Sequence, residues 1–130
     1  PSIVKVTSNK KFKKMDEYSN SIKLINEAMY KVVNEKGGTA VKSKSDKFYF
    51  AGKTGTSQVK KITLEERESE TFRKAEIEWK NRDHALFVGY MPTVKPKYAI
   101  SVVIEHGGSG ASTAAPIAKD VFNFLHEKKI

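Results

Sequence analysis

The sequence contains no cysteine, four prolines and one tryptophan among its 130 residues. The absence of cysteine excludes disulfides, thiolate metal sites and a cysteine nucleophile. No apolar run approaches the roughly 20 residues that span a bilayer, and no apolar segment of a signal peptide follows the N-terminal lysines. Because 38% of the residues are nevertheless hydrophobic, we expect one folded domain rather than a disordered chain.

Acidic residues are scarce relative to basic ones, since 15 Asp and Glu against 24 Lys and Arg give a net charge of +9. Five lysines lie within the first 14 residues, which include no Asp or Glu. This excess leaves two interpretations open: a basic, non-enzymatic module for an anionic polymer, or a fragment of a larger and more neutral protein. We expect the fragment, because Pro1 stands where an initiator Met would. We expect no nucleic acid partner, because no aromatic stacking platform is interleaved with these lysines.

Helical periodicity predicts two helices. The first is expected over about residues 17–36, capped by Asp16 or Ser19 and ended by Gly37-Gly38. The second is expected over residues 113–128, capped by Ser112 or Thr113. The apolar residues predicted to face the core are Ile22, Ile25, Met29, Val32 and Val33 in the first helix, and Ile117, Val121, Phe124 and Leu125 in the second.

Three strands are predicted over residues 47–51, 85–91 and 98–104. In the last of them, alternate apolar residues share one face: Tyr98, Ile100, Val102 and Ile104. Prolines flank the 92–97 connection, which predicts an antiparallel hairpin. The fold class is therefore α+β, an antiparallel sheet of about three strands with helices packed on it. Residues 1–130 are expected to be one unit, with the nearly all-polar residues 60–83 as a surface excursion.

The segment Lys53-Thr54-Gly55-Thr56 carries the strongest chemical signal. Lysine brings a positive charge, the threonine hydroxyls can donate to a carboxylate, and glycine lets a ligand lie along the strand edge. The backbone N–H of Thr56 can face a developing oxyanion. This combination predicts a site for an anionic, peptide-like ligand, and Lys-Thr-Gly belongs to the signature of serine β-lactamases and penicillin-binding proteins.

Other chemical interpretations of the sequence are weaker. Gly52-Lys53-Thr54 imitates the end of a phosphate-binding loop, but Lys47 stands where that motif requires glycine. The three histidines (His84, His106 and His126) are too scattered to predict a zinc site, and we expect structural roles for them. Asp83 is expected to form a salt bridge or a cap, and residues 107–110 a tight turn. No metal or cofactor is expected.

Several short motifs follow one another over about residues 20–128. They are Val32-Val33-Asn34, Gly38-Thr39-Ala40, the 51–59 segment around Lys-Thr-Gly, Asp83-His84 before residues 85–92, the 105–110 segment and Ala114-Ala115-Pro116-Ile117. Their order resembles the C-terminal part of the transpeptidase domain of class B penicillin-binding proteins. The Asp-His pair most resembles the elongation-type members of that family.

The resemblance implies a peptidoglycan D,D-transpeptidase that works through an acyl-serine intermediate and is acylated by β-lactams. By motif match, Lys53, Thr54, Gly55 and Thr56 would bind the carboxylate of the substrate. Lys53 would also act electrostatically, and the Thr56 N–H would complete the oxyanion hole. The implied partners are the peptidoglycan stem peptide, β-lactams, the upstream remainder of the protein and the cell-wall elongation machinery. The implied location is the inner membrane, with the catalytic domain on the periplasmic side.

The sequence departs from the family pattern in its nucleophile. Ser-x-x-Lys occurs three times, beginning at Ser2, Ser8 and Ser57, but never at the start of an apolar helix. Ser-x-Asn does not occur. The chain thus carries one of three catalytic motifs and no nucleophile, and we expect this fragment to be inactive by itself.

Overall fold

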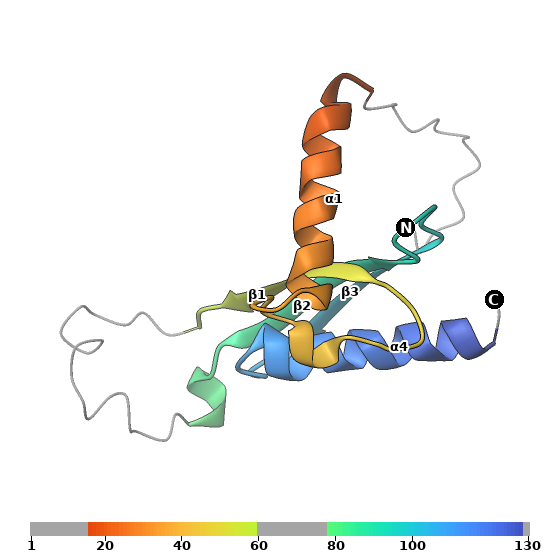
Figure 1. The fold of residues 1–130 in the computed structure, drawn as a ribbon. Coiled ribbons are helices and arrows are strands. Elements are labelled where there is room, and N and C mark those ends of the chain that lie inside the picture. The colour runs from red at the N-terminus through yellow and green to blue at the C-terminus, as the bar shows by residue number, and fades with distance from the viewer. Residues whose placement is uncertain (1–15, 60–77, 129–130) are drawn as a thin grey trace, which may run out of the picture.

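The computed structural model describes residues 16–59 and 78–128, which form an antiparallel sheet with helices packed against it (Figure 1). The sheet has the order β1-β2-β3 and the helices are α1 and α4. The bounds are α1 Ser19–Asn34, β1 Ala51–Ser57, β2 His84–Met91, β3 Tyr98–Ile104 and α4 Ala115–Glu127. The predicted α+β class is confirmed. Neither described α-helix is both long and apolar enough to cross a membrane.

The predicted hairpin is confirmed, because β2 and β3 pair antiparallel with Phe87 opposite Val102 and Met91 opposite Tyr98. The predicted face of β3 is also confirmed. Val102 is buried, and Tyr98, Ile100 and Ile104 pack against the same core. On the other face of this hairpin, Val88 and Val103 are 46% and 57% exposed. Within the described residues, the core therefore lies on one side of the hairpin.

Three phenylalanines from different segments form the centre of that core. The Phe50 ring lies 6.3 Å from the Phe87 ring of β2 and 5.4 Å from the Phe122 ring of α4. All three side chains are fully buried. Helix α4 runs along the sheet (Figure 1), and its small residues Ala115 and Ala118 are also fully buried. Small side chains allow a close approach of the helix to the strands, while Phe122 fills the remaining space.

The predicted buried stripe of α4 is largely wrong. Ile117, Val121 and Phe124 are 40%, 41% and 55% exposed, whereas Leu125 packs against the core as predicted. The true stripe combines the alanines with Phe122 and Leu125, which also follow helical spacing. The sequence of α4 contains two sets of apolar residues at helical spacing. The prediction chose the set with the larger side chains, which is the exposed one. The predicted caps are also wrong, because no side chain caps α4 and the Thr113 hydroxyl instead donates to the Gly107 carbonyl at 2.8 Å.

Helix α1 ends just before Gly37-Gly38, as predicted, but only its last turns reach the core. Val33 is buried and Met29 and Val32 are half-buried, while Ile22 and Ile25 are 37% and 57% exposed. The helix stands out from the sheet (Figure 1), so no described residue lies beneath its first turns. The predicted caps are again wrong, because Tyr18 precedes the helix and no side chain caps it.

The first strand lies later in the chain than predicted. Of the residues predicted as a strand, 47–50 are not part of one, although Phe48 and Phe50 are buried, and β1 begins only at Ala51. The physical reason lies in Asn34 of α1, whose side-chain amide donates to the Phe50 carbonyl at 2.9 Å. That carbonyl is therefore bonded to a helix rather than to a neighbouring strand. The predicted excursion at 60–83 lies outside the described residues as far as residue 77, and a short 3₁₀ turn covers Trp79–Asn81.

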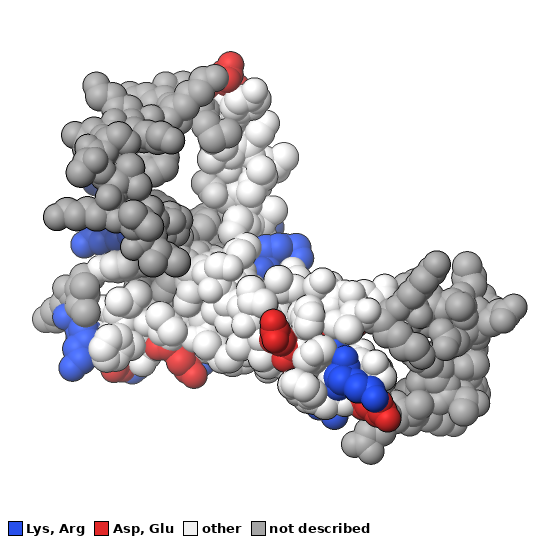
Figure 2. All heavy atoms as spheres, turned by 180° about the vertical axis from the view of Figure 1, so that it is seen from behind, with Lys and Arg blue, Asp and Glu red and all other residues white. Residues whose placement is uncertain are grey.

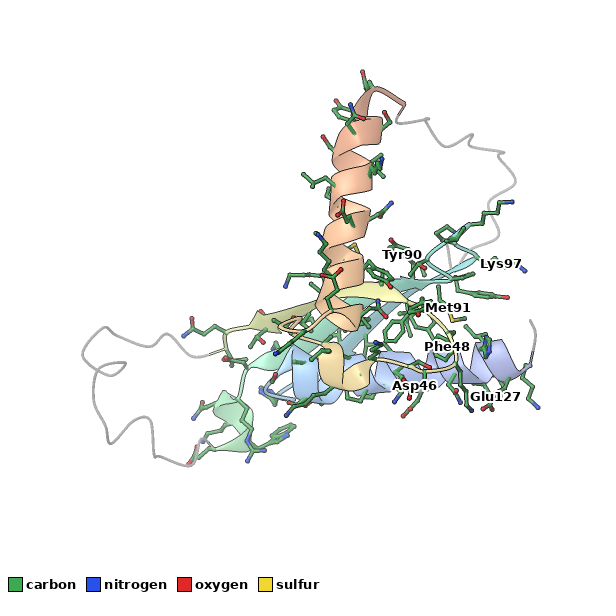
Figure 3. All side chains as sticks on the ribbon, viewed as in Figure 1. Asp46, Phe48, Tyr90, Met91, Lys97 and Glu127 are labelled. Carbon is green, nitrogen blue, oxygen red and sulfur yellow. The ribbon has the colours of Figure 1, made fainter. Side chains whose placement is uncertain are left out.

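The loop before β1 is tied to the end of α4. Glu127 lies near the C-terminal end of α4, beside the loop that carries Asp46 and Phe48 (Figure 3). The Lys47 ammonium donates to Glu127 Oε1 at 3.1 Å, and the Asn123 amide donates to the same oxygen at 3.0 Å. These donors, Lys47 first, hold the pKa of Glu127 below the ordinary 4.5. Because the pKa is lowered in the folded state, the stabilisation is present above pH 4.5 and is lost as pH falls through the folded-state pKa.

The buried face of α4, which differs from the predicted one, can be tested directly. Phe122→Ala should lower the free energy of unfolding by about 3–5 kcal/mol, because it leaves a cavity beside Phe50 and Phe87. Phe124→Ala removes the same atoms from a half-exposed position and should cost below about 1 kcal/mol. Urea denaturation of both variants measures the difference. Equal losses would contradict the orientation of α4.

A second test concerns the Lys47 and Glu127 pair. In Lys47→Met, the pKa of Glu127 should rise toward 4.5 and stay slightly below it, because the Asn123 donor remains. An NMR titration of the Glu127 side-chain carboxyl carbon measures this shift. The matched control is Lys97→Met, which removes a lysine from the connection between β2 and β3. A Glu127 titration that is the same in all three proteins would show that the ion pair does not form.

Candidate functional site

All four residues of the predicted motif lie on β1 itself. β1 pairs with β2 through Lys53 opposite Val88 and Thr56 opposite Ala85. In the sheet order of the described residues β1 is an edge strand, so one side of its backbone is not paired with another described strand. The amides and carbonyls on such an edge can bind an extended peptide in the manner of an added strand.

The two residues with the strongest donors are exposed or half-exposed on this strand. Lys53 is exposed, and its ammonium donates to the Thr54 carbonyl at 2.7 Å. Thr54 is half-buried, and its hydroxyl lies 2.9 Å from the hydroxyl of Thr39. A positive charge and an ordered hydroxyl thus occupy neighbouring positions along an edge strand. This arrangement suits a carboxylate better than a neutral ligand, because hydrogen bonds to charged groups are the stronger ones.

Gly55 is placed by a close backbone contact that the sequence does not reveal. A π-helical turn, Gly110–Ala114, leads into α4 and packs against β1 and β2. A Cβ atom at Gly110 would collide with the carbonyl oxygens of Gly55 and Leu86. The start of α4 therefore presses directly on the backbone of the motif strand, and only glycine permits that approach.

Thr56 is exposed and borders a cavity of about 500 Å³. The other lining residues are Arg82, Asp83, Gly108 and Ser109. Asp83 links two other segments through hydrogen bonds to their backbones. Its carboxylate accepts from the Val59 N–H at 3.3 Å, and its carbonyl accepts from the Gly108 N–H at 2.8 Å. Asp83 thus accepts from backbone N–H groups in two loops, whereas a salt bridge or a cap was predicted for it. The tight turn predicted at residues 107–110 lies earlier, over residues 104–107, where the Gly107 N–H donates to the Ile104 carbonyl at 3.1 Å, and Gly110 instead begins the π-helical turn.

Two of the three histidines lie together beside this cavity, which the sequence did not suggest. The rings of His84 and His106 lie 4.9 Å apart, and Trp79 lies 4.5 Å from His106. The backbone N–H of His106 donates to His84 Nδ1 at 2.9 Å, so this nitrogen carries no proton. His126 lies elsewhere, with its ring 5.2 Å from that of Phe48. In residues 16–59 and 78–128, no group of three or more acidic or histidine side chains is able to hold a metal ion.

The geometry places Lys53, Thr54 and Thr56 on one edge strand of the described sheet, and comparison with known proteins gives the family. The model of the penicillin-binding protein transpeptidase domain matches residues 1–123. Because this match covers nearly the whole chain, the chain belongs to the family of penicillin-binding protein transpeptidase domains.

Curated relatives carry the name peptidoglycan D,D-transpeptidase MrdA. That of Haemophilus influenzae is 37% identical over 103 residues, which are 78% of this chain and 15% of the relative. That of Acinetobacter baumannii is 41% identical over 98 residues, which are 75% of this chain and 14% of the relative. The chain thus spans about one-seventh of the length of the relatives that it matches.

Solved structures of penicillin-binding protein 2 share the fold. In the complex of PBP2 with MreC from Helicobacter pylori, the match has a TM-score of 0.66 and 30% identity, covering 86% of this chain and 18% of that one. For Pseudomonas aeruginosa PBP2 in complex with WCK 5153, the TM-score is 0.56 and the identity 35%, covering 76% of this chain and 18% of that one. The resemblance inferred from the motifs is confirmed.

The described residues contain no Ser-x-x-Lys motif at the start of a helix. Ser57 is exposed at the end of β1, while Ser2 and Ser8 lie outside the part that the structure describes. The five N-terminal lysines also lie outside it, so their proposed contact with an anionic polymer stays a prediction. On the face shown in Figure 2, the described Lys and Arg residues lie in separate places among Asp and Glu.

The contact between Gly110 and the motif strand is testable. Gly110→Ala should destabilise the chain by about 1–3 kcal/mol, because the added methyl group forces two backbones apart. The amide signals of Gly55 and Thr56 should shift in the NMR spectrum. Ser109→Ala is the control, since Ser109 is exposed, and should leave stability and these signals nearly unchanged. If both variants behave alike, α4 does not press on β1.

Proposed function

We propose that this chain is the part of a peptidoglycan D,D-transpeptidase that binds the terminal carboxylate of the stem peptide, or the carboxylate of a β-lactam. The observation that carries the proposal is the placement of Lys53, Thr54 and Thr56 on an edge strand. The family match and the names of the relatives support it. The chain supplies this function within a longer protein, since it spans about 15% of the curated relatives.

The reaction begins with a serine from the remainder of the protein, which attacks the carbonyl of the penultimate D-alanine. An ester bond forms, the amide bond breaks, and the terminal D-alanine leaves with a proton on its amine. The amine of a second stem peptide then attacks the ester and forms the cross-link, and a proton from this amine restores the serine hydroxyl. Lys53 and the hydroxyls of Thr54 and Thr56 hold the carboxylate of the terminal D-alanine until that residue leaves, and the Thr56 N–H stabilises the oxyanion of both steps.

The location and the partners follow from the same proposal. A cross-linking enzyme must reach the cell wall, so we place the catalytic part on the periplasmic side of the inner membrane. The Helicobacter pylori relative was solved in complex with MreC, and this supports a place for the longer protein in the cell-wall elongation machinery. No metal or cofactor takes part in the proposed chemistry.

Acylation by penicillin tests the proposal. Intact mass measured after excess benzylpenicillin should show one adduct on the longer protein and none on residues 1–130 alone. Thr54→Val in the longer protein should slow the adduct about 10- to 100-fold, because a hydrogen bond to a charged group contributes about 1.5–3 kcal/mol. Thr93→Val is the matched control, since Thr93 lies beyond the far end of β2 and should leave the rate unchanged.

Two outcomes would contradict the proposal. If the folded longer protein gains no adduct, it is not a penicillin-acylated transpeptidase, and the salt dependence of polyanion binding then tests the basic module. If Thr54→Val and Thr93→Val slow acylation equally, β1 does not bind the carboxylate.

A further inference from the structure

The link between α1 and β1 brings a second threonine to the motif strand. Thr39 follows Gly37-Gly38, and its hydroxyl lies 2.9 Å from that of Thr54. The backbone on either side of Thr39 is fixed, because the Gly38 N–H donates to the Glu35 carbonyl and the Ala40 N–H donates to the Val32 carbonyl, both at 3.0 Å. Ala40 is also fully buried in the core. Thr39 is therefore exposed but held in place.

The end of α1 is fixed relative to β1 as well. Asn34 is buried, and its side-chain amide donates to the Tyr30 carbonyl within the helix and to the Phe50 carbonyl just before β1, each at 2.9 Å. Val33 is fully buried beside it. Thr39 and Thr54 are thus carried by two elements that are bonded to each other, so their contact does not depend on a loose loop.

We propose that Thr39 is a positioning residue, whose hydroxyl donates to the Thr54 oxygen and so directs the Thr54 proton toward the carboxylate of the ligand. A threonine hydroxyl has one donor and two acceptor lone pairs. If Thr54 donated to Thr39, it would have no proton left for a carboxylate. If Thr39 donates, Thr54 accepts one bond and donates the other. This inference rests on the proposed function, because it needs a carboxylate at Thr54.

The arrangement also strengthens the Thr54 donor. In a chain of hydrogen bonds each group polarises the next, so a hydroxyl that accepts a bond becomes a better donor. The Thr39 contact further restricts the rotation of the Thr54 side chain, which removes part of the ordering cost when the ligand binds. Both effects act on the carboxylate and neither acts directly on the acylated carbonyl.

The test uses the longer protein that contains this chain. The second-order rate constant of acylation is measured for benzylpenicillin, whose carboxylate is free, and for its methyl ester, whose carboxylate is masked. The variants are Thr39→Val, Thr39→Ser, Thr54→Val and the double variant with both valines. Thermal unfolding of each variant shows whether it is folded.

Thr39→Val should lower the rate constant for benzylpenicillin about five- to tenfold, the size of one neutral hydrogen bond. The ester should lose less than about twofold, and Thr39→Ser should restore the rate, because it keeps the hydroxyl. In the Thr54→Val background, Thr39→Val should have no further effect, since its target is already gone.

Four results would overturn the inference. Equal losses for the free acid and the ester would mean that Thr39 supports the fold and not the carboxylate site. Additive losses in the double variant would mean that Thr39 does not act through Thr54, and this comparison needs only benzylpenicillin. A parent protein that is not acylated would overturn the proposed function and this inference together. If Thr54→Val slows acylation of the parent protein and Thr39→Val does not, only the role of Thr39 is overturned.

Discussion

The contact among Phe50, Phe87 and Phe122 is the interaction on which the remaining structure depends. It joins the segment before β1, the central strand β2 and helix α4, which are far apart in the sequence. Each ring is fully buried, and burial of one such side chain contributes about 1.5–3 kcal/mol. Phe50 stands directly before β1, so the same contact that forms the core also holds the start of the motif strand against it.

The site follows from how the inner residues of β1 are packed. Ala51 and Gly52 are buried, and a Cβ atom at Gly52 would collide with the Phe87 ring. The strand is therefore pressed onto the core at one end, while Lys53 and Thr56 remain exposed beyond it. Gly110 presses on the same strand at Gly55. A rigid edge with charged and hydroxyl groups is suited to bind a ligand with little rearrangement.

In the proposed function, the chain holds one part of a catalytic site and the longer protein supplies the other parts. Its residues supply a positive charge, hydroxyl donors and an edge of backbone amides, all of which act on an anion. In the proposed function the nucleophile comes from the remainder of the longer protein, and the chain spans about 15% of its curated relatives. Under that proposal, different segments of the protein contribute the binding of the carboxylate and the attack on the carbonyl.

The sequence by itself determined the α+β class, the hairpin, the inner face of β3 and the family, because strand alternation and short motifs are local properties. It did not determine which side of α4 is buried, since Ala115, Ala118 and Phe122 compete with larger residues at the same helical spacing. It also did not reveal the contacts of Thr39 with Thr54, Gly110 with Gly55 or His84 with His106. Each of these contacts joins residues at least 15 positions apart, so only tertiary packing decides whether they meet.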